Sequence, residues 1–360
     1  ILAKMELIAT CAFGLEKLVY DEMKKLNLWV EKTEDGRIFF KGEEIDLVRA
    51  NLWLRCADRV QIKVGEFSAT TFEELFNHVN ALDWEKYIGA SDAFPVAATS
   101  VKSILHSEPA IQSIVKKAIV KKLQQKNAIE IFPENSGAVF QIVVKTNKDQ
   151  FVISIDSSGE SLHKRGYRTH TNVAPIKETL AAALVKLSDW TPQRTLIDAF
   201  CGSGTIGIEA ALIAQNIAPG LRREFAFEKW PWMNQEEIAT TRKEAQEAEK
   251  PEQKFQIFCS DIDPETIKIA QQNAKNAGIE NIQFQQSDFK NLDFSTFENC
   301  TFISNPPYGE RLEEKSHVEE MTREFGKKFT QTKNCSLFFI TSHENFTQLF
   351  ERPADKNRKL

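Results

Sequence analysis

Hydrophobic and polar positions in the first 54 residues follow alternating strand-like and helical patterns. Residues 5–10 alternate in the manner of a strand, and residues 14–26 carry apolar side chains at helical spacing. Asp35-Gly36 separates two further strand-like runs, as in a β-hairpin, and a helix is expected over residues 43–54. This mixture of short strands and helices predicts a small α+β module.

A second pattern of the same kind begins at about Val60 and predicts a second α+β module. In chain order, its elements are a strand over residues 59–67, a helix over 72–79, a strand over 94–100, a helix over 109–123, and strands near 138–145 and 150–156. Residues 157–172 are rich in glycine, serine and positive charge and lack periodicity, which is typical of a connection between domains.

The second half of the chain alternates helical patterns with short, fully apolar strands. Helices are expected over residues 173–188, 205–214, 264–277 and 317–329, and strands over 195–200, 255–260, 282–285, 300–304 and 336–341. Such repeated units predict a doubly wound, Rossmann-like α/β domain, in which helices cover both faces of a parallel sheet. Ligands bind these sheets at the carboxyl ends of the strands. Residues 218–252 form a long interruption between the first two strand units.

Length and composition limit the possible classes of protein. The 360 residues allow two or three domains at roughly 150 residues each. The longest apolar runs, such as residues 337–340, are far shorter than the roughly 20 residues that cross a bilayer. Because Ile1 does not open a secretory signal pattern, we expect a cytoplasmic protein. Six scattered cysteines without a C-x-x-C pair argue against disulfides and a zinc site, so no bound metal is expected.

The first strand of the second half leads into a glycine-rich turn, "DAFCGSGTIG". Gly202, Gly204 and Gly207 match the pattern G-x-G-x-x-G, which is a weak signal alone because a glycine turn also serves strand–helix packing. The N–H groups at a helix start can bind a phosphate or a carboxylate. Since Asp198 could also accept a hydrogen bond from a ligand ammonium, an amino-acid group fits this turn better than a pyrophosphate.

Acidic side chains follow the next two strands. Asp261 is placed where a carboxylate can accept both hydrogen bonds of a ribose diol. Asp263 is expected to cap the helix that begins at Pro264. Asp288 could accept from an adenine amino group beside the ring of Phe289, but a loop cap is an equally good interpretation of Asp288.

The fourth strand ends in "NPPY", which is the most specific signal in the chain. Two prolines fix the backbone and donate no hydrogen bonds, so nearby carbonyl groups remain free to accept. The side-chain oxygen of Asn305 and the carbonyl of Pro306 could accept both hydrogens of a planar amine. Tyr308, after Pro307, presents a ring on which a base could stack.

These motifs resemble the class I methyltransferases that use S-adenosylmethionine, in the branch marked by (D/N/S)-P-P-Y. The segment "NVAPIKETLAAAL" is similar to the extra helix-start motif of that branch and would bring Lys177 and its neighbours near the methionine end of the cofactor. The resemblance implies a catalytic turn made of Asn305, Pro306, Pro307 and Tyr308. The cofactor-binding residues that it implies are Pro175, Glu178, Thr179, Asp198, Phe200, Gly202, Ser203, Gly204, Thr205, Asp261, Ile262, Asp288 and Phe289.

Stretches such as "GLEKLVYDEM", "RANLWLRCADRV", "ESLHKRGYRTHTNVAPIKETLAAAL" and "NIAPGLRR" together resemble the THUMP-containing RNA methyltransferases of the RlmL type. That family methylates the N2 amine of a guanine in 23S ribosomal RNA. The resemblance implies a ferredoxin-like segment over 1–44, a THUMP domain over 45–157, a linker over 158–170 and a methyltransferase domain over 171–360. Members continue into a final strand beyond "RPADKNRKL", so the last hairpin is expected to be incomplete in this sequence.

A net charge of −5 gives no overall reason to expect nucleic acid, but local charge does. The basic residues that could follow phosphates are Lys102, Lys116, Lys117, Lys121, Lys122, Lys126, His163, Lys164, Arg165, Arg168 and His170. A solvated lysine-rich helix face is the alternative interpretation. An RNA substrate would have to extrude its target base, because an amine inside a helix is out of reach.

Two other functions stay open at this point. The tetrapeptide NPPY also marks adenine-N6 DNA methyltransferases, since it recognises an amine and not a particular base. A non-catalytic RNA-binding protein is the third candidate. The oligomeric state does not follow from the sequence.

Overall fold

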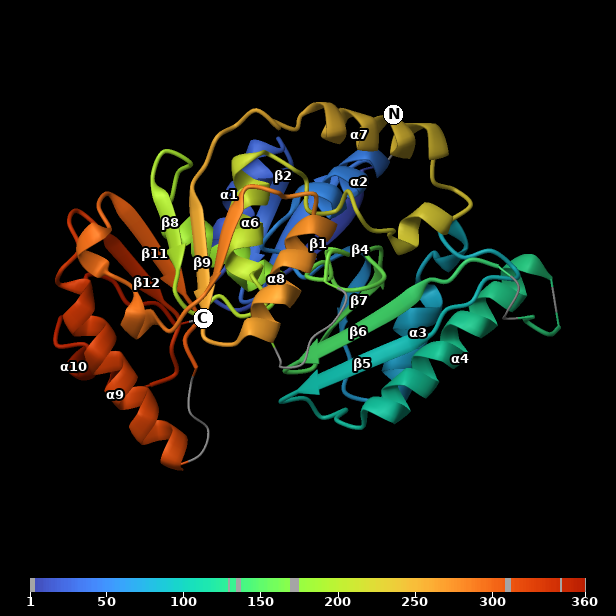
Figure 1. Cartoon of the computed structure of the whole chain (residues 1–360). Coiled ribbons are helices and arrows are strands. Elements are labelled where there is room, and N and C mark those ends of the chain that lie inside the picture. The colour runs from blue at the N-terminus through green and yellow to red at the C-terminus, as the bar shows by residue number, and fades with distance from the viewer. Residues whose placement is uncertain are drawn as a thin grey trace. The chain divides into compact units, whose positions relative to one another are not determined.

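The computed structural model describes residues 4–128, 130–133, 137–168, 175–307, 312–343 and 345–359. The chain divides into two compact units, and each is described by itself (Figure 1). The first consists of Ile1–Leu162 with Glu224–Lys243, and the second of His163–Arg223 with Glu244–Leu360.

A seven-stranded sheet forms the first unit, in the order β2-β3-β1-β4-β7-β6-β5. The strands are β1 (Met5–Thr10), β2 (Trp29–Glu34), β3 (Arg37–Gly42), β4 (Arg59–Ser68), β5 (Val96–Val101), β6 (Gln141–Asn147) and β7 (Gln150–Asp156). β5 and β6 run parallel, and the other neighbours run antiparallel. Because β4 pairs with both β1 and β7, the two modules expected from the sequence share one continuous sheet.

The helices of the first unit are α1 (Glu16–Lys25), α2 (Glu44–Trp53), α3 (Phe72–Ala81) and α4 (Glu108–Asn127). Each confirms an expected helix. Thr71 caps α3 by accepting a hydrogen bond from the backbone N–H of Glu74. α4 runs four residues beyond its expected end and stops at Ala128, whose φ of 52° is left-handed.

Part of the long interruption between the first two strand units of the second half belongs to the first unit. Trp230 is buried, stacks on Phe140 with ring centroids 4.9 Å apart, and donates from its indole N–H to the carbonyl of Val139. Trp232 donates in the same way to the carbonyl of Tyr87. The side chains of Trp230 and Trp232 are therefore fixed by packing and hydrogen bonds within the first unit. The interruption also contains α7 (Gln235–Glu247).

A five-stranded parallel sheet in the order β10-β9-β8-β11-β12 forms the second unit. Its strands are β8 (Thr195–Asp198), β9 (Ile257–Asp261), β10 (Ile282–Gln286), β11 (Cys300–Ser304) and β12 (Ser336–Phe339). The helices are α5 (Glu178–Leu187), α6 (Thr205–Ala214), α8 (Pro264–Asn276), α9 (Leu312–Phe329) and α10 (Phe346–Leu349). α5 begins later than the expected residue 173, because Lys177 is an extended N-cap; residues 173 and 174 lie outside the described part.

Alternating side chains of the parallel sheet enter two separate cores, which confirms the doubly wound fold. Leu196 and Ile303 pack with residues of α5, α6 and α8. Ile197 and Phe302 point to the opposite face and pack with residues of α9. The carboxyl ends of β8, β9 and β11 consequently meet at one edge of the sheet, where the candidate site residues begin.

Candidate active site

The glycine turn after β8 opens space on one side and packs tightly on the other. Gly202 and Gly204 have φ values of 51° and 80°, which favour glycine. A Cβ added at Gly202 would meet none of the described residues within 4 Å, so the backbone there borders space that they leave open. A Cβ added at Gly207 would lie 2.6 Å from Sγ of Cys259. The first glycine thus suits a ligand, whereas Gly207 serves helix–sheet packing.

Asp198 ends β8 as a fully buried carboxyl group. Its Oδ1 accepts hydrogen bonds from Ser304 Oγ at 2.8 Å and from the N–H of Phe200 at 3.2 Å. Its Oδ2 is buried without a hydrogen-bond partner among the described residues. Burial raises the pKa of Asp198 to about 7, and the nearby charge of Asp261 adds to this, against the two hydrogen bonds. A carboxyl group in this state is suited to receive a cation.

Asp261 ends the neighbouring strand β9 and fastens the glycine turn. Its Oδ2 accepts from the N–H of Gly202 at 2.9 Å, and its Oδ1 accepts from the N–H of Asp263 at 3.1 Å. Each carboxylate oxygen has a second lone pair, so both can still accept from a ligand diol. Ile262 follows with a 63% exposed side chain, an apolar surface next to that carboxylate. Asp263 caps α8 by accepting from the N–H of Glu265, as the sequence predicts.

Asp288, after β10, is a loop cap in this structure. Its Oδ1 accepts from the N–H of Lys290 at 3.0 Å. The ring of Phe289 is only 5% exposed and packs against Phe200 and Phe325, with centroids 5.3 and 5.4 Å apart. Phe289 therefore lies in the core, and Phe200, which is half-buried, packs on the same aromatic cluster.

The turn after β11 is tied to the end of β8 by Ser304. This serine is fully buried, donates to Asp198, and accepts from the N–H of Ala199 at 3.2 Å. Asn305 follows directly, half-buried, and Pro306 is buried while Pro307 is exposed. Tyr308 lies outside the described residues. Sequence reasoning missed Ser304, although its place immediately before the Asn-Pro-Pro turn could have marked it.

Comparison with known families identifies the domains of this chain. The sequence model of the RMKL-like methyltransferase domain matches residues 165–360, and the models of the RlmL ferredoxin-like domain and the THUMP domain match residues 6–61 and 69–156. The chain belongs to the RMKL-like methyltransferase family. The domain boundaries expected from the sequence stay a prediction.

Two curated relatives align over almost the whole chain. YpsC of Bacillus subtilis, named as a candidate RNA methyltransferase, is 47% identical, over 99% of this chain and 93% of that protein. The ribosomal RNA large subunit methyltransferase K/L of Vibrio parahaemolyticus is 31% identical, over 98% of this chain and 51% of that protein. The chain thus spans about half the length of this K/L relative.

Two solved structures have the same fold from end to end. One is a protein of Listeria monocytogenes described as a predicted N6-adenine-specific DNA methylase, with 45% identity, a TM-score of 0.95, and coverage of 100% of this chain and 94% of that one. The other is SMU.472, a methyltransferase candidate complexed with SAH, with 44% identity, a TM-score of 0.94, and coverage of 100% and 95%.

Within the methyltransferase domain, Arg168 joins the extra helix-start motif to the glycine turn. Its Nη2 donates to Thr205 Oγ1 at 2.7 Å and to the carbonyl of Ile176, and its Nη1 lies 3.5 Å from Glu178 Oε1. Burial raises the pKa of Glu178, although Arg168 opposes this. The buried Oε2 of Glu178 lacks a hydrogen-bond partner in the described part of the chain.

Other predicted cofactor contacts lie near Arg168, Glu178 and Thr205. Thr179 is buried on α5, Pro175 precedes that helix, and the Ser203 hydroxyl lies 3.3 Å from Thr205 Oγ1. The Ser203 carbonyl accepts from Asn273 of α8 at 3.1 Å, so α8 also supports the turn.

The prediction that Arg165 contacts RNA is wrong for this structure. Arg165 is 3% exposed, and its Nε lies 3.4 Å from Oε1 of the fully buried Glu209 on α6. Tyr167 donates to the same oxygen at 3.1 Å. A buried carboxylate requires a nearby cation, so Arg165 stabilises the domain by pairing with Glu209 in its interior.

Arg168, which was also predicted to contact RNA, is only 15% exposed and is instead hydrogen-bonded to Thr205 and paired with Glu178 inside its own unit. The predicted lysine contacts are exposed or partly exposed. Lys116 and Lys121 of α4 lie over the rings of Phe94 and Phe76, at 4.8 and 5.5 Å from the ring centroids. Lys117 is exposed on the same helix. Lys102 and Lys164 are also exposed, Lys122 is half-exposed, and His170 lies outside the described residues. Their contact with RNA stays a prediction.

No helix in the described ranges combines the length and the apolar character that crossing a membrane demands.

Proposed function

We propose that this chain is an S-adenosylmethionine-dependent RNA methyltransferase that modifies the N2 amine of a guanine in 23S ribosomal RNA. The observation that carries the proposal is the hydrogen bond from Ser304 to Asp198. It ties the turn that begins at Asn305 to the strand end that precedes the glycine turn. An amine bound at the turn that begins at Asn305 would thus lie close to a cofactor bound at the glycine turn.

The residues at the edge of the sheet fit this cofactor. The Oδ2 of Asp198, which has no hydrogen-bond partner among the described residues, suits the ammonium of the cofactor's methionine part. The space that those residues leave open at Gly202 admits a ligand close to the backbone. Asp261 suits the ribose diol, and the exposed Ile262 suits the adenine face. The relative SMU.472 was solved in complex with SAH, which supports the choice of cofactor. When bound, the cofactor supplies an electrophilic methyl group.

The chain itself would orient the amine. Asn305 Oδ1 and the Pro306 carbonyl accept the two amine hydrogens, which turns the nitrogen lone pair out of conjugation with the base. Positioning of this kind can provide several kcal/mol, on the order of the effective molarities of intramolecular reactions. The base must leave its helix to reach this turn, and Tyr308 would stack on it. The nitrogen loses its proton to water after the transfer, so Asn305 acts without taking a proton.

RNA is favoured as the substrate by the THUMP match and by the names of the K/L relative and of YpsC. The second candidate is adenine-N6 methylation of DNA, which the name of the Listeria relative favours. Purified 23S ribosomal RNA and duplex DNA, each incubated with labelled S-adenosylmethionine, separate these two. A non-catalytic RNA-binding protein would show no heat on calorimetric titration with S-adenosylmethionine.

The Asn305→Ala variant tests the assignment of roles. We expect its turnover to fall at least about a hundredfold, the scale of losing one preorganised polar contact in a transition state, with cofactor affinity nearly unchanged. Asn291→Ala, at an exposed position that ends the 3-10 helix Phe289–Asn291 of the same unit, is the matched control and should keep full activity. Loss of cofactor binding together with turnover in Asn305→Ala would contradict the assigned roles.

A further inference from the structure

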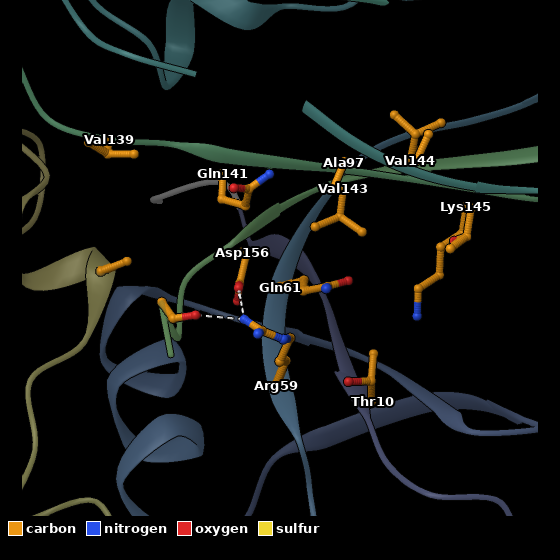
Figure 2. A pocket seen from close by; sticks show the side chains of 14 residues that line it. Thr10, Arg59, Gln61, Ala97, Val139, Gln141, Val143, Val144, Lys145 and Asp156 are labelled. Atoms are coloured by element: carbon orange, nitrogen blue, oxygen red, sulfur yellow. Dashed lines mark hydrogen bonds and ion pairs between the residues drawn. The ribbon is translucent and has the colours of Figure 1, made fainter. Parts of the chain in front are cut away.

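A cavity of about 580 Å³ opens along the seven-stranded sheet, with all its lining residues in the first unit. Side chains of β1, β4, β5, β6 and β7 line it, and Figure 2 shows Gln141, Val143 and Lys145 on the side of β6 that faces Gln61 and Asp156. The volume falls in the range of about 300–1,000 Å³ that is typical of small-ligand sites. None of the cofactor or amine contacts described above contributes to it.

Strand geometry places two polar side chains of β6, Gln141 and Lys145, at this cavity. Along β6, Gln141, Val143 and Lys145 share one side of the strand and border the cavity, whereas the intervening Ile142 is fully buried. Figure 2 shows the side chain of Lys145 extending from β6 into the same space as Gln61 and Thr10.

Lys145 carries the uncompensated charge of the cavity. It makes no hydrogen bond or ion pair with any residue in the ranges that the structure describes. Burial lowers its pKa, and the positive charges of Arg37 and Arg59 lower it further, against an opposing effect of Asp58. The charge of Arg59 is already paired, because its Nη1 donates to the Asp156 carboxylate and also to the carbonyl of Gly159 at 2.6 Å. An anion would therefore gain most from Lys145.

Two neutral donors accompany this ammonium group. Gln61 is 3% exposed, and its Oε1 accepts from Ser154 Oγ at 3.0 Å, which leaves its amide nitrogen as a donor. The Thr10 hydroxyl adds a third donor from β1. Ala97 and Val143 give the cavity an apolar side, and none of the described lining residues is aromatic. A group rich in acceptor oxygens matches such donors, while base stacking, which needs a ring, is not available.

We propose that this cavity binds a phosphate group of an unpaired nucleotide in the substrate RNA, with Lys145 as its charged contact. Only the source of the phosphate rests on the proposed function; the donor set itself does not. Without an aromatic platform, the cavity would hold the backbone in place and accept any base.

Fluorescence anisotropy with a labelled ten-nucleotide single-stranded RNA tests this. Lys145→Gln should raise the Kd about tenfold and reduce the slope of log affinity against log salt by about 0.7, the share of one phosphate. Lys148→Gln, in the exposed turn between β6 and β7, is the matched control and should change neither quantity. Equal losses in the two variants, or no loss in Lys145→Gln, would overturn the proposal. Because Lys145 has no hydrogen-bond or ion-pair partner to lose among the described residues, the variant should melt within a few degrees of the wild type.

Adenosine monophosphate separates the possible sources of the phosphate. Binding that depends on Lys145 for this nucleotide but not for the oligonucleotide would overturn an RNA ligand. Methyl transfer is measured in parallel with the wild-type protein. If oligonucleotide binding depends on Lys145 while no RNA is methylated, the cavity assignment stands and the proposed function fails. If RNA is methylated while Lys145→Gln binds the oligonucleotide normally, the proposed function stands and the cavity assignment fails.

Discussion

Cofactor affinity should depend on pH through Asp198. This carboxyl has a pKa of about 7 in the ligand-free protein, and a ligand ammonium requires its ionised form. By that pKa, the ionised fraction rises from about 9% at pH 6.0 to about 76% at pH 7.5, so the association constant should rise about eightfold. Below pH 6, each further unit of pH should lower the association constant close to tenfold, since each binding event then releases one proton.

Isothermal titration calorimetry with S-adenosylmethionine between pH 5.5 and 7.5 measures this dependence. Asp198→Asn should remove the dependence and weaken binding by roughly 1.5–3 kcal/mol, the worth of a hydrogen bond to a charged group. Ser304→Ala removes a donor that lowers the pKa of Asp198, so its midpoint should move to higher pH. A wild-type affinity that stays constant from pH 5.5 to 7.5 would refute the reasoning.

Three further variants test packing, charge and the predicted RNA surface. Glu209→Ala removes the carboxylate that faces the buried Arg165, and thermal unfolding should report a loss of about 3–5 kcal/mol; a loss below 1 kcal/mol would contradict a buried pair. Gly207→Ala places a Cβ against Cys259 Sγ and should cost about 1–3 kcal/mol in urea unfolding, whereas an unchanged midpoint would show that the helix shifts freely. Lys117→Glu should weaken RNA binding and flatten its salt dependence, and an unchanged affinity at low salt would remove α4 from the RNA surface.

Most of the fold was predictable because its signals are local. The period of apolar positions placed α3, α6 and α8 within a few residues of their observed bounds. The Asp263-Pro264 pair marked a helix start, since both residues act within a single turn. The strand ends that carry Asp198 and Asp261 followed from the order of apolar runs and from the geometry of parallel sheets.

The features that escaped prediction depend on contacts between distant parts of the chain. The single sheet of the first unit arises because β4 pairs with β1 and β7, which no local pattern specifies. Arg165 looked like a phosphate contact because a sequence gives charge and not burial, and its partner Glu209 lies 44 residues away. The role of Ser304 in joining two strand ends likewise required their spatial register.

Nucleoside analysis by mass spectrometry tests the central claim most directly. Unmodified 23S ribosomal RNA is incubated with the protein and labelled S-adenosylmethionine, digested, and examined for labelled nucleosides. We predict labelled N2-methylguanosine with the wild-type protein and its loss with Asn305→Ala. Labelled N6-methyladenosine, or no labelled nucleoside although the cofactor binds, would contradict the account.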